Sequence, residues 1–346
     1  MKSKLFAIFT LSVLVLNVAG SALADTKAQR AKRAADTAAI VAMLPASDGV
    51  VVFDVKTFLG SALPQMLSGN QAMLAEVTKA IEEAKTKTGI DVRQFETLAA
   101  GVSATKIREK EYDLDSVLIA RGQVSSGAVL AAAKLAAKGK YREEKVGEKT
   151  IYIFDAREVA AQNAPQTAGV HSKVLKAFSK EMAAFAVDTN TLAFGSVSKV
   201  KATAEGTTRV DKEITDLLSK TGVATFAARV PAGMSDFLPL DNDELGKNID
   251  SIKMMYGSMN VNAAGTTLSA TARTLQAEQA VGLKETLDGL QMLGKMFLGN
   301  AKGADKEVYA RLIDNVKFTN KGNEVSMDLA IAQTDVDFLV GLLAKK

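Results

Sequence analysis

Apolar and polar positions along the chain recur in one order, in which two short apolar runs flank a turn and a helical pattern follows. The clearest case is Ala183–Gly206. Its runs Ala183–Val187 and Leu192–Gly195 are separated by Asp, Thr and Asn residues, which predicts a β-hairpin. Ser196 or Ser198 can cap the helix that follows, and a glycine ends it.

The same hairpin-and-helix order is predicted in three other places. Their strand pairs are Leu98–Thr105 with Ser116–Arg121, Lys253–Val261 with Thr267–Thr274, and Val316–Thr319 with Glu324–Ala332. A charged connection, Lys106–Asp115, separates the strands of the first of these pairs. In the long helix that follows the second pair, the spacing predicts that seven side chains face inward, namely Val281, Leu283, Leu287, Leu290, Met292, Leu293 and Met296.

Two buried strands are each followed by a short apolar turn of helix, which suggests an internal duplication. Val50–Val55 precedes Phe58–Leu63, a short helix that Pro64 is expected to stop, and Val223–Val230 precedes a similar turn. We expect an α+β fold with antiparallel or mixed sheets and helices on one face. Its two similar halves would be 48–206 and 207–346. Strand order, and whether the halves share one sheet, stay open.

The N-terminus has the pattern of an export signal. Lys2 and Lys4 precede the apolar run Leu5–Ala19, and small residues surround a cleavage site after Ala24. We expect residues 1–24 to be removed and 25–47 to form a helix and linker. The mature protein would then be periplasmic or secreted and would have no membrane span.

Composition narrows the classes of function. The chain has 346 residues, no cysteine, 47% hydrophobic and 24% charged residues, as a globular protein does. Without cysteine it has no disulfide, thiol nucleophile or lipoprotein anchor. The formal net charge is +4, and loss of Lys2 and Lys4 with the leader leaves +2, which is too small to indicate a nucleic acid partner.

A resemblance follows from Leu44–Val55, Gly89–Asp91 and Phe185–Ser198. These stretches resemble a loose class of exported bacterial proteins of unknown function, built from tandem hairpin-and-helix units behind a signal peptide. The resemblance implies a fold and a location. That class has no known catalytic or binding residue, so the resemblance assigns none to this chain.

Candidate chemistry around serine and histidine is sparse. His171 is the only histidine, so a site with several His ligands is excluded, and we expect His171 to be an exposed loop residue. Ser198 and Lys201 match the Ser-x-x-Lys pattern of penicillin-recognising enzymes, with a Lys-Thr-Gly from Lys220, but the element between these two is missing. Ser103 and Lys106 match the same short pattern at a strand end. Such matches recur by chance.

Metal sites are also weakly indicated. Asp241 and Asp243 open a calcium-loop pattern, but Ile252 occupies the twelfth place, where a bidentate Glu is required, so we expect a solvated acidic turn. Met292 and Met296 could hold Cu(I), together with Met254, Met255 and Met259 on a strand. Their leucine neighbours instead favour core packing.

The sequence therefore predicts no catalytic, cofactor-binding or metal-binding residue. Our hypothesis is a non-enzymatic exported envelope protein that binds an envelope protein or an apolar ligand through a sheet face or the cleft between its halves. One alternative is a hydrolase with an unrecognised serine or carboxylate site, which a broad activity-probe screen would reveal. Another is a structural envelope component that acts by association.

Overall fold

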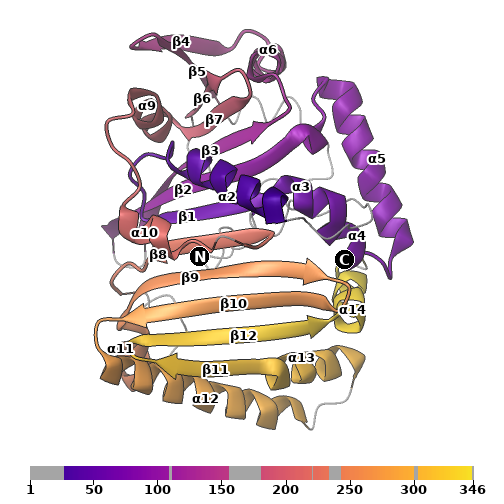
Figure 1. Cartoon of the computed structure of the whole chain (residues 1–346), viewed down its shortest axis with the longest axis vertical. Coiled ribbons are helices and arrows are strands. Elements are labelled where there is room, and N and C mark those ends of the chain that lie inside the picture. Colours follow the sequence, from indigo (N-terminus) through magenta and orange to yellow (C-terminus); the bar gives the residue numbers. More distant parts are fainter. Residues whose placement is uncertain are drawn as a thin grey trace.

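A computed structural model describes residues 27–108, 111–155, 181–219, 221–233, 243–299 and 303–344 (Figure 1). The expected leader 1–24 and His171 lie outside these ranges. In the first part of the chain the elements are α2 (Lys27–Val41), β1 (Gly49–Asp54), α3 (Val55–Thr57), η1 (Phe58–Ala62), α4 (Leu63–Met66), α5 (Gln71–Thr88), η2 (Val92–Gln94), β2 (Phe95–Arg108), β3 (Glu111–Gly122), α6 (Ser126–Ala136), β4 (Tyr141–Val146), β5 (Lys149–Asp155), β6 (Glu181–Asp188), β7 (Thr191–Ser196) and α9 (Val197–Glu205).

The second part continues the same alternation. Its elements are α10 (Lys212–Leu217), β8 (Ala224–Arg229), α11 (Asp243–Asp250), β9 (Ile252–Asn262), β10 (Gly265–Thr274), α12 (Ala277–Gly299), α13 (Ala304–Asn315), β11 (Val316–Lys321), β12 (Glu324–Ala332) and α14 (Gln333–Ala344). None of the described helices is long and apolar enough to cross a bilayer.

All described strands belong to one sheet of 12 strands in the order β11-β12-β10-β9-β8-β1-β2-β3-β7-β6-β5-β4. Every neighbouring pair is antiparallel. The expected α+β class with an antiparallel sheet is confirmed. The sheet is continuous across the expected boundary, because β1 pairs with both β2 and β8.

Strand order on the two sides of the β1–β8 pair follows one scheme. Outward from β1 the order is β2, β3, β7 and β6, and outward from β8 it is β9, β10, β12 and β11, with the hairpin β4–β5 added at one edge. The central strands also share one alternation, in which Val50 and Val52 of β1, and Thr225 and Ala227 of β8, are the buried residues. An internal duplication stays a prediction.

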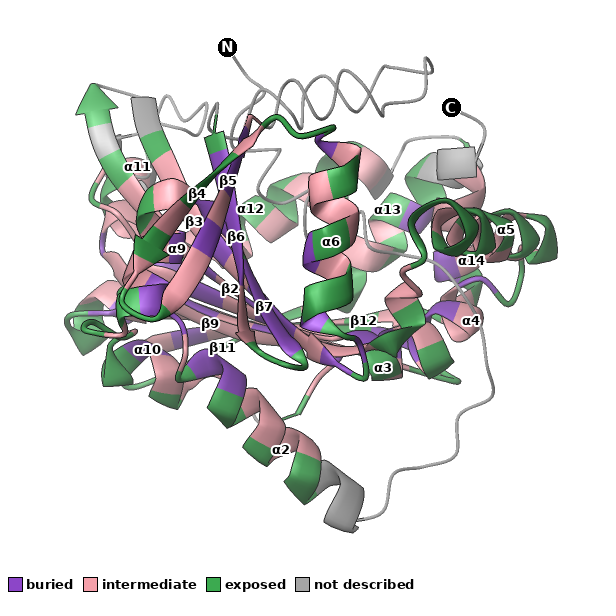
Figure 2. Ribbon diagram, turned by 90° about the horizontal axis from the view of Figure 1, so that it is seen from above, coloured by how far each residue is buried: buried purple, intermediate pink, exposed green. Residues whose placement is uncertain are grey.

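Alternation along β1 divides the sheet into two faces, which we name the Val50 face and the Val51 face. The main buried cluster lies on the Val50 face, where Ile40 of α2, Val200 of α9 and Ile214 of α10 are fully buried. Leu130 of α6 packs on the opposite, Val51 face with Ala184 and Leu192 of β6 and β7. Helices thus cover both faces and not one as expected; Figure 2 shows α2 and α6 on opposite sides.

Local signals at the ends of α5 hold as predicted. The Asn70 side chain accepts a hydrogen bond from the Met73 backbone N–H at 3.0 Å, and Gly89 takes the left-handed conformation at φ 72°. Asn70 thus pairs a free backbone N–H at the start of the helix, and Gly89 supplies the left-handed residue that ends it.

Two other local expectations are wrong. Pro64 does not stop a helix: it lies in the first turn of α4, directly after the π-helical turn η1, and the helical path from Val55 continues to Met66. The charged connection Lys106–Asp115 is also not a loop. β2 and β3 stay paired from Ser103–Asp115 outward to Arg108–Glu111, because an antiparallel strand pair can carry charged side chains where it faces water.

One buried polar group on the Val50 face generates a stability prediction. Thr225 is 5% exposed, and its Oγ1 has no hydrogen-bond partner among the described residues. Thr225→Val removes an unsatisfied hydroxyl at nearly constant volume, so the free energy of unfolding should rise by about 1 kcal/mol. Denaturant unfolding of both proteins measures this difference in the free energy of unfolding.

Thr271→Val is the matched control. Thr271 is similarly buried on β10, but its hydroxyl lies 2.9 Å from Ser326 Oγ, so this variant should lose stability. A Thr225→Val protein that is less stable than the original would contradict the assignment of an orphaned hydroxyl.

Candidate functional site

A single row of apolar side chains crosses the Val51 face perpendicular to the strands. Consecutive cross-strand partners place its seven members side by side on β7, β3, β2, β1, β8, β9 and β10. They are Phe194, Leu118, Ala100, Val51, Phe226, Gly257 and Ala270. We call this set the apolar row. It contains no charged or polar side chain.

No member of the apolar row is fully buried. Phe194 is 43% exposed, whereas Ala193, its neighbour on the same strand, is 0% exposed on the Val50 face. Val51 shows the same contrast with Val50 and Val52, which are both buried. The row is therefore a half-exposed apolar strip in the middle of a sheet whose other face is closed.

Three clusters of helices surround the row without including it. Among the described residues, α6 closes the Val51 face toward β4, and α12 closes it over β10 and β12 through Leu283 and Val325. Phe58 and Leu63 of the η1–α4 segment pack on one end of β9. The strip between these clusters is the part of the Val51 face that they leave half-exposed.

Gly257 keeps the row smooth on β9, the sixth of its seven strands. A Cβ on this residue would lie 2.2 Å from the Ser269 carbonyl oxygen and 2.8 Å from Phe226 Cε1. Any side chain here would displace the sheet or the Phe226 ring. Sequence patterning could not single out this glycine, because its role depends on strands that are distant in the chain.

The prediction that seven side chains of α12 face inward is wrong for five of them. Of the seven residues expected to face inward, Leu283 is buried and Leu287 packs beside it. The others are exposed, and they are Val281, Leu290, Met292, Leu293 and Met296. Met292 and Met296 are 65% and 62% exposed, so core packing is wrong for both.

The physical reason is the length of α12 relative to the surface beneath it. Beyond Leu287 only one side of the helix is covered. Gln291 donates to the Ile313 and Val316 carbonyls at 2.7 and 2.8 Å, and Gly294 lies against Ile313. Leu290, Met292, Leu293, Met296 and Phe297 form an exposed apolar surface, which we call the α12 end.

The structure does not assemble the predicted Ser-x-x-Lys pair. Ser198 donates to Asp115 Oδ2 at 2.5 Å, whereas Lys201 pairs with Glu144 at 2.5 Å. Instead Lys199 donates to Ser103 Oγ at 2.6 Å and to the Ala46 carbonyl at 2.6 Å. The Lys106 side chain lies outside the described residues, as does Lys220.

Lys199 joins three elements, and sequence reasoning missed it. Burial lowers the pKa of its amine, while Asp115 and Asp48 oppose that shift. In this arrangement the ammonium donates to two oxygens, which ties the start of α9 to β2 and to the chain before β1. A serine hydrolase would need the neutral amine as a proton acceptor. The observed hydrogen bonds instead give Lys199 a structural role, in which it holds the three segments together.

The candidate metal positions are not assembled either. Asp243 begins the helix α11, so the calcium-loop pattern continues as helix and not as the expected acidic turn; Asp241 lies outside the described residues. Met254 is buried on the Val50 face, away from Met255 on the opposite face of β9. Within the described ranges, no three His, Asp or Glu side chains are grouped to hold a metal ion.

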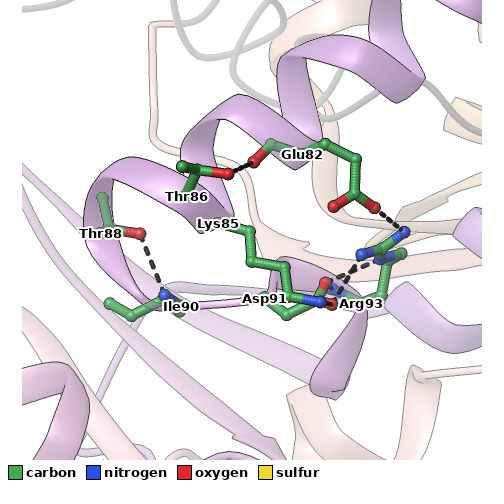
Figure 3. Close-up of polar contacts among 7 residues, drawn as sticks. All are labelled: Glu82, Lys85, Thr86, Thr88, Ile90, Asp91 and Arg93. Atoms are coloured by element: carbon green, nitrogen blue, oxygen red, sulfur yellow. Dashed lines mark hydrogen bonds and ion pairs between the residues drawn. The ribbon is translucent and has the colours of Figure 1, made fainter.

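A groove of about 660 Å³ runs beside α5. It is lined by Leu59, Gln71, Leu74, Ala75, Thr78, Lys79, Glu82 and Arg93. At its end Arg93 bonds Asp91 at 2.7 Å and Glu82 at 2.6 Å, and Lys85 lies 3.1 Å from Asp91 (Figure 3). Each of these charges has an opposite partner, so the cluster anchors α5 and offers no free charge to a ligand.

Comparison with known proteins identifies no relative from which function could be transferred. No protein-family model and no curated protein matches the chain. Among solved structures, crystal form I of TP0453 is 11% identical with a TM-score of 0.39, over 88% of this chain and 97% of that one. Crystal form III is 10% identical with a TM-score of 0.40, over 87% and 96%. Scores this low establish neither a shared fold nor a shared function.

The Asp91 cluster generates a prediction with a defined pH dependence. The bond to Arg93 holds the pKa of the Asp91 carboxyl well below its usual range. Asp91→Asn should lower the free energy of unfolding at pH 7 by about 1–2 kcal/mol. Because the folded pKa is depressed, this difference is present above the unfolded pKa of about 3.9 and is lost as pH falls further toward the folded value.

Denaturant unfolding at a series of pH values measures the difference, and Glu83→Gln is the control. Glu83 forms only exposed pairs with Lys79 and Lys87 at 4.0 and 3.7 Å, so this change should cost at most a few tenths of a kcal/mol. An Asp91→Asn effect that stayed constant down to pH 2 would contradict the ionic anchor.

Proposed function

We propose that the chain is an exported envelope protein that binds an apolar ligand non-covalently on the Val51 face of its sheet. The observation that carries the proposal is the apolar row, and above all the 43% exposure of Phe194 at one end of this uncharged strip. Export is supported by the leader pattern before Asp25.

The sequence of the central strands supports an apolar occupant. Val50–Phe53 and Ala224–Ala228 are nearly continuous apolar runs, which is typical of strands that are covered on both faces. In the structure α2, α9 and α10 close the Val50 face, whereas the apolar row on the Val51 face stays half-exposed. Covering apolar surface stabilises a complex by about 25 cal/mol per Å², so the half-exposed strip favours a molecule that completes the burial.

Association through the α12 end is the second candidate, because exposed apolar patches mark interaction sites. Phe297 is 78% exposed there. This observation favours the structural envelope component over the hydrolase, for which Ser103, Ser198 and their partners give no assembled nucleophile and base. The apolar row is preferred because it lies on the central strands of the sheet.

An uncharged environment-sensitive dye, N-phenyl-1-naphthylamine, tests the preferred site. The mature protein should bind it with enhanced fluorescence, and Phe194→Asp should weaken binding at least tenfold because it places a carboxylate in the strip. Phe297→Asp is the matched control and should leave the affinity unchanged. Circular dichroism and a thermal melt establish that both variants fold.

If Phe297→Asp weakened dye binding and Phe194→Asp did not, the apolar site would be assigned to the α12 end instead. Absence of dye binding by the unmodified protein, or equal losses in both variants, would contradict an apolar site on the sheet.

Export generates a separate prediction. When the full precursor is expressed in a Gram-negative host, the mature protein should be recovered from the periplasm or medium with Asp25 as its first residue, as intact-mass spectrometry would show. A control with Leu14→Arg in the apolar run should stay inside the cell at full length. Recovery of the unmodified chain with Met1 still attached would overturn the proposed location.

A further inference from the structure

The α12 end gathers five large apolar side chains that are 43% to 78% exposed. We infer that it binds a second copy of this chain, with the two α12 helices antiparallel about a two-fold axis near Leu293. This surface is separate from the apolar row, and the inference stands whether or not the row binds a ligand. It depends on the shape and area of the α12 end, on one glycine within it, and on the charges at its border.

The five side chains lie on one side of α12, opposite the side that is covered. At 100° per residue, they and Gly289 spread over an arc of roughly 160°. On the other side of the helix, Gln291 donates to the Ile313 carbonyl, and Gly294 lies against the Ile313 side chain. The arc is therefore a convex helix surface, which suits a second helix packed along it.

A two-fold axis near Leu293 matches this arc with itself. Leu290 and Phe297 are about equally far from Leu293 along the helix and lie on the same flank of the arc, and Met292 and Met296 share the other flank. In an antiparallel pair, Leu290 of each copy therefore packs beside Phe297 of the other, and Leu293 faces its own copy. Such an interface uses the same patch on both subunits.

The area of the α12 end is close to the lower limit for a specific dimer. With roughly 200 Å² for a fully exposed side chain of this size, the exposed fractions leave about 600 Å² in each copy. Specific interfaces bury about 800 Å² per partner. The dimer should therefore exchange with the monomer at micromolar concentrations and not be permanent.

Gly289 supports the close approach of a second helix. It lies within α12, where glycine is less favourable than alanine. A Cβ on this residue would meet nothing within 4 Å, so no contact among the described residues requires a glycine. Gly289 lies near the centre line of the exposed arc, where the missing side chain leaves room for a side chain of the second copy.

Charges beside the α12 end favour a protein partner over an anionic lipid surface. Helices that lie on such membranes usually carry many lysines or arginines on their polar face. Lys284 pairs with Asp288 at 2.6 Å. Lys295, the other lysine of α12, pairs with Asp314 at 3.1 Å. Because both positive charges of this helix have acidic partners, the α12 end matches another apolar surface better than charged headgroups.

Sedimentation velocity of the mature protein from about 1 to 100 µM tests the pairing. Leu293→Asp should weaken the dimer at least tenfold, because it places two carboxylates at the two-fold axis. Leu135→Asp is the matched control: Leu135 is 81% exposed on α6, and the dissociation constant should stay within twofold. Gly289→Ala should weaken the dimer at least threefold without lowering the thermal midpoint of the dilute monomer.

The absence of cysteine from the chain allows the orientation to be measured. Leu290→Cys and Phe297→Cys proteins, one of them with a mass tag, are mixed and treated with a short bis-maleimide. The mixed pair should crosslink at least fivefold faster than either variant with itself. Leu135→Cys is the control and should not crosslink.

Several results would overturn the inference. A monomer at every concentration, or a dimer that Leu293→Asp leaves intact, would refute pairing through the α12 end. Faster crosslinking of Leu290→Cys with itself would refute the antiparallel arrangement. A monomer that binds vesicles of phosphatidylethanolamine and phosphatidylglycerol, and loses them in Leu293→Asp, would assign the α12 end to a lipid surface. Dye binding by the apolar row is measured separately, so the two proposals can fail independently.

Discussion

Antiparallel pairing between β1 and β8 is the interaction on which the rest of the molecule depends. Five residue pairs from Gly49–Ala228 to Phe53–Ala224 join the first and second parts of the chain into one sheet. Both strands bury alternate residues on the Val50 face, where α2 and α10 pack. The same pairing places Val51 beside Phe226 on the opposite face and so makes the apolar row continuous across the centre of the molecule.

Charged side chains lie on both edge strands of the sheet, which leaves the face of the sheet as the candidate functional surface. A free edge strand can pair with another chain, and natural proteins often protect it with charged side chains. β11 carries Lys317 and Lys321, so an antiparallel second copy centred on Thr319 would bring like charges together. At the other edge, Arg142 of β4 is paired with Glu181. Both edges thus carry charged side chains that oppose the addition of a further strand, and the apolar row lies on the face between them.

Local signals made much of the fold predictable. The hairpin around Asn190 and the capped helix α5 depend on neighbours in sequence, and both were expected from the residues alone. The apolar run Val50–Val55 also indicated a buried strand. What it could not indicate was how completely each face is covered, because that depends on helices placed by distant parts of the chain.

The errors have the same origin. Periodicity correctly grouped Leu290 and Met296 with Leu283 as apolar positions, but it carries no information about where the supporting surface ends, so the exposed α12 end was missed. The Lys199–Ser103 bond links residues 96 positions apart, and short motifs such as Ser198–Lys201 cannot anticipate it. The apolar row is likewise a product of register between strands, which no single segment encodes.

Photocrosslinking with an uncharged apolar probe that bears a diazirine tests the central claim most directly, because it reports the location of the bound probe on the unmodified mature protein. After irradiation and proteolysis, crosslinked peptides should map to the strands of the apolar row, around Phe194, Leu118, Ala100 and Phe226. Excess N-phenyl-1-naphthylamine should abolish those crosslinks. Crosslinks concentrated on Leu290–Phe297, or crosslinks that the excess dye does not reduce, would contradict the account.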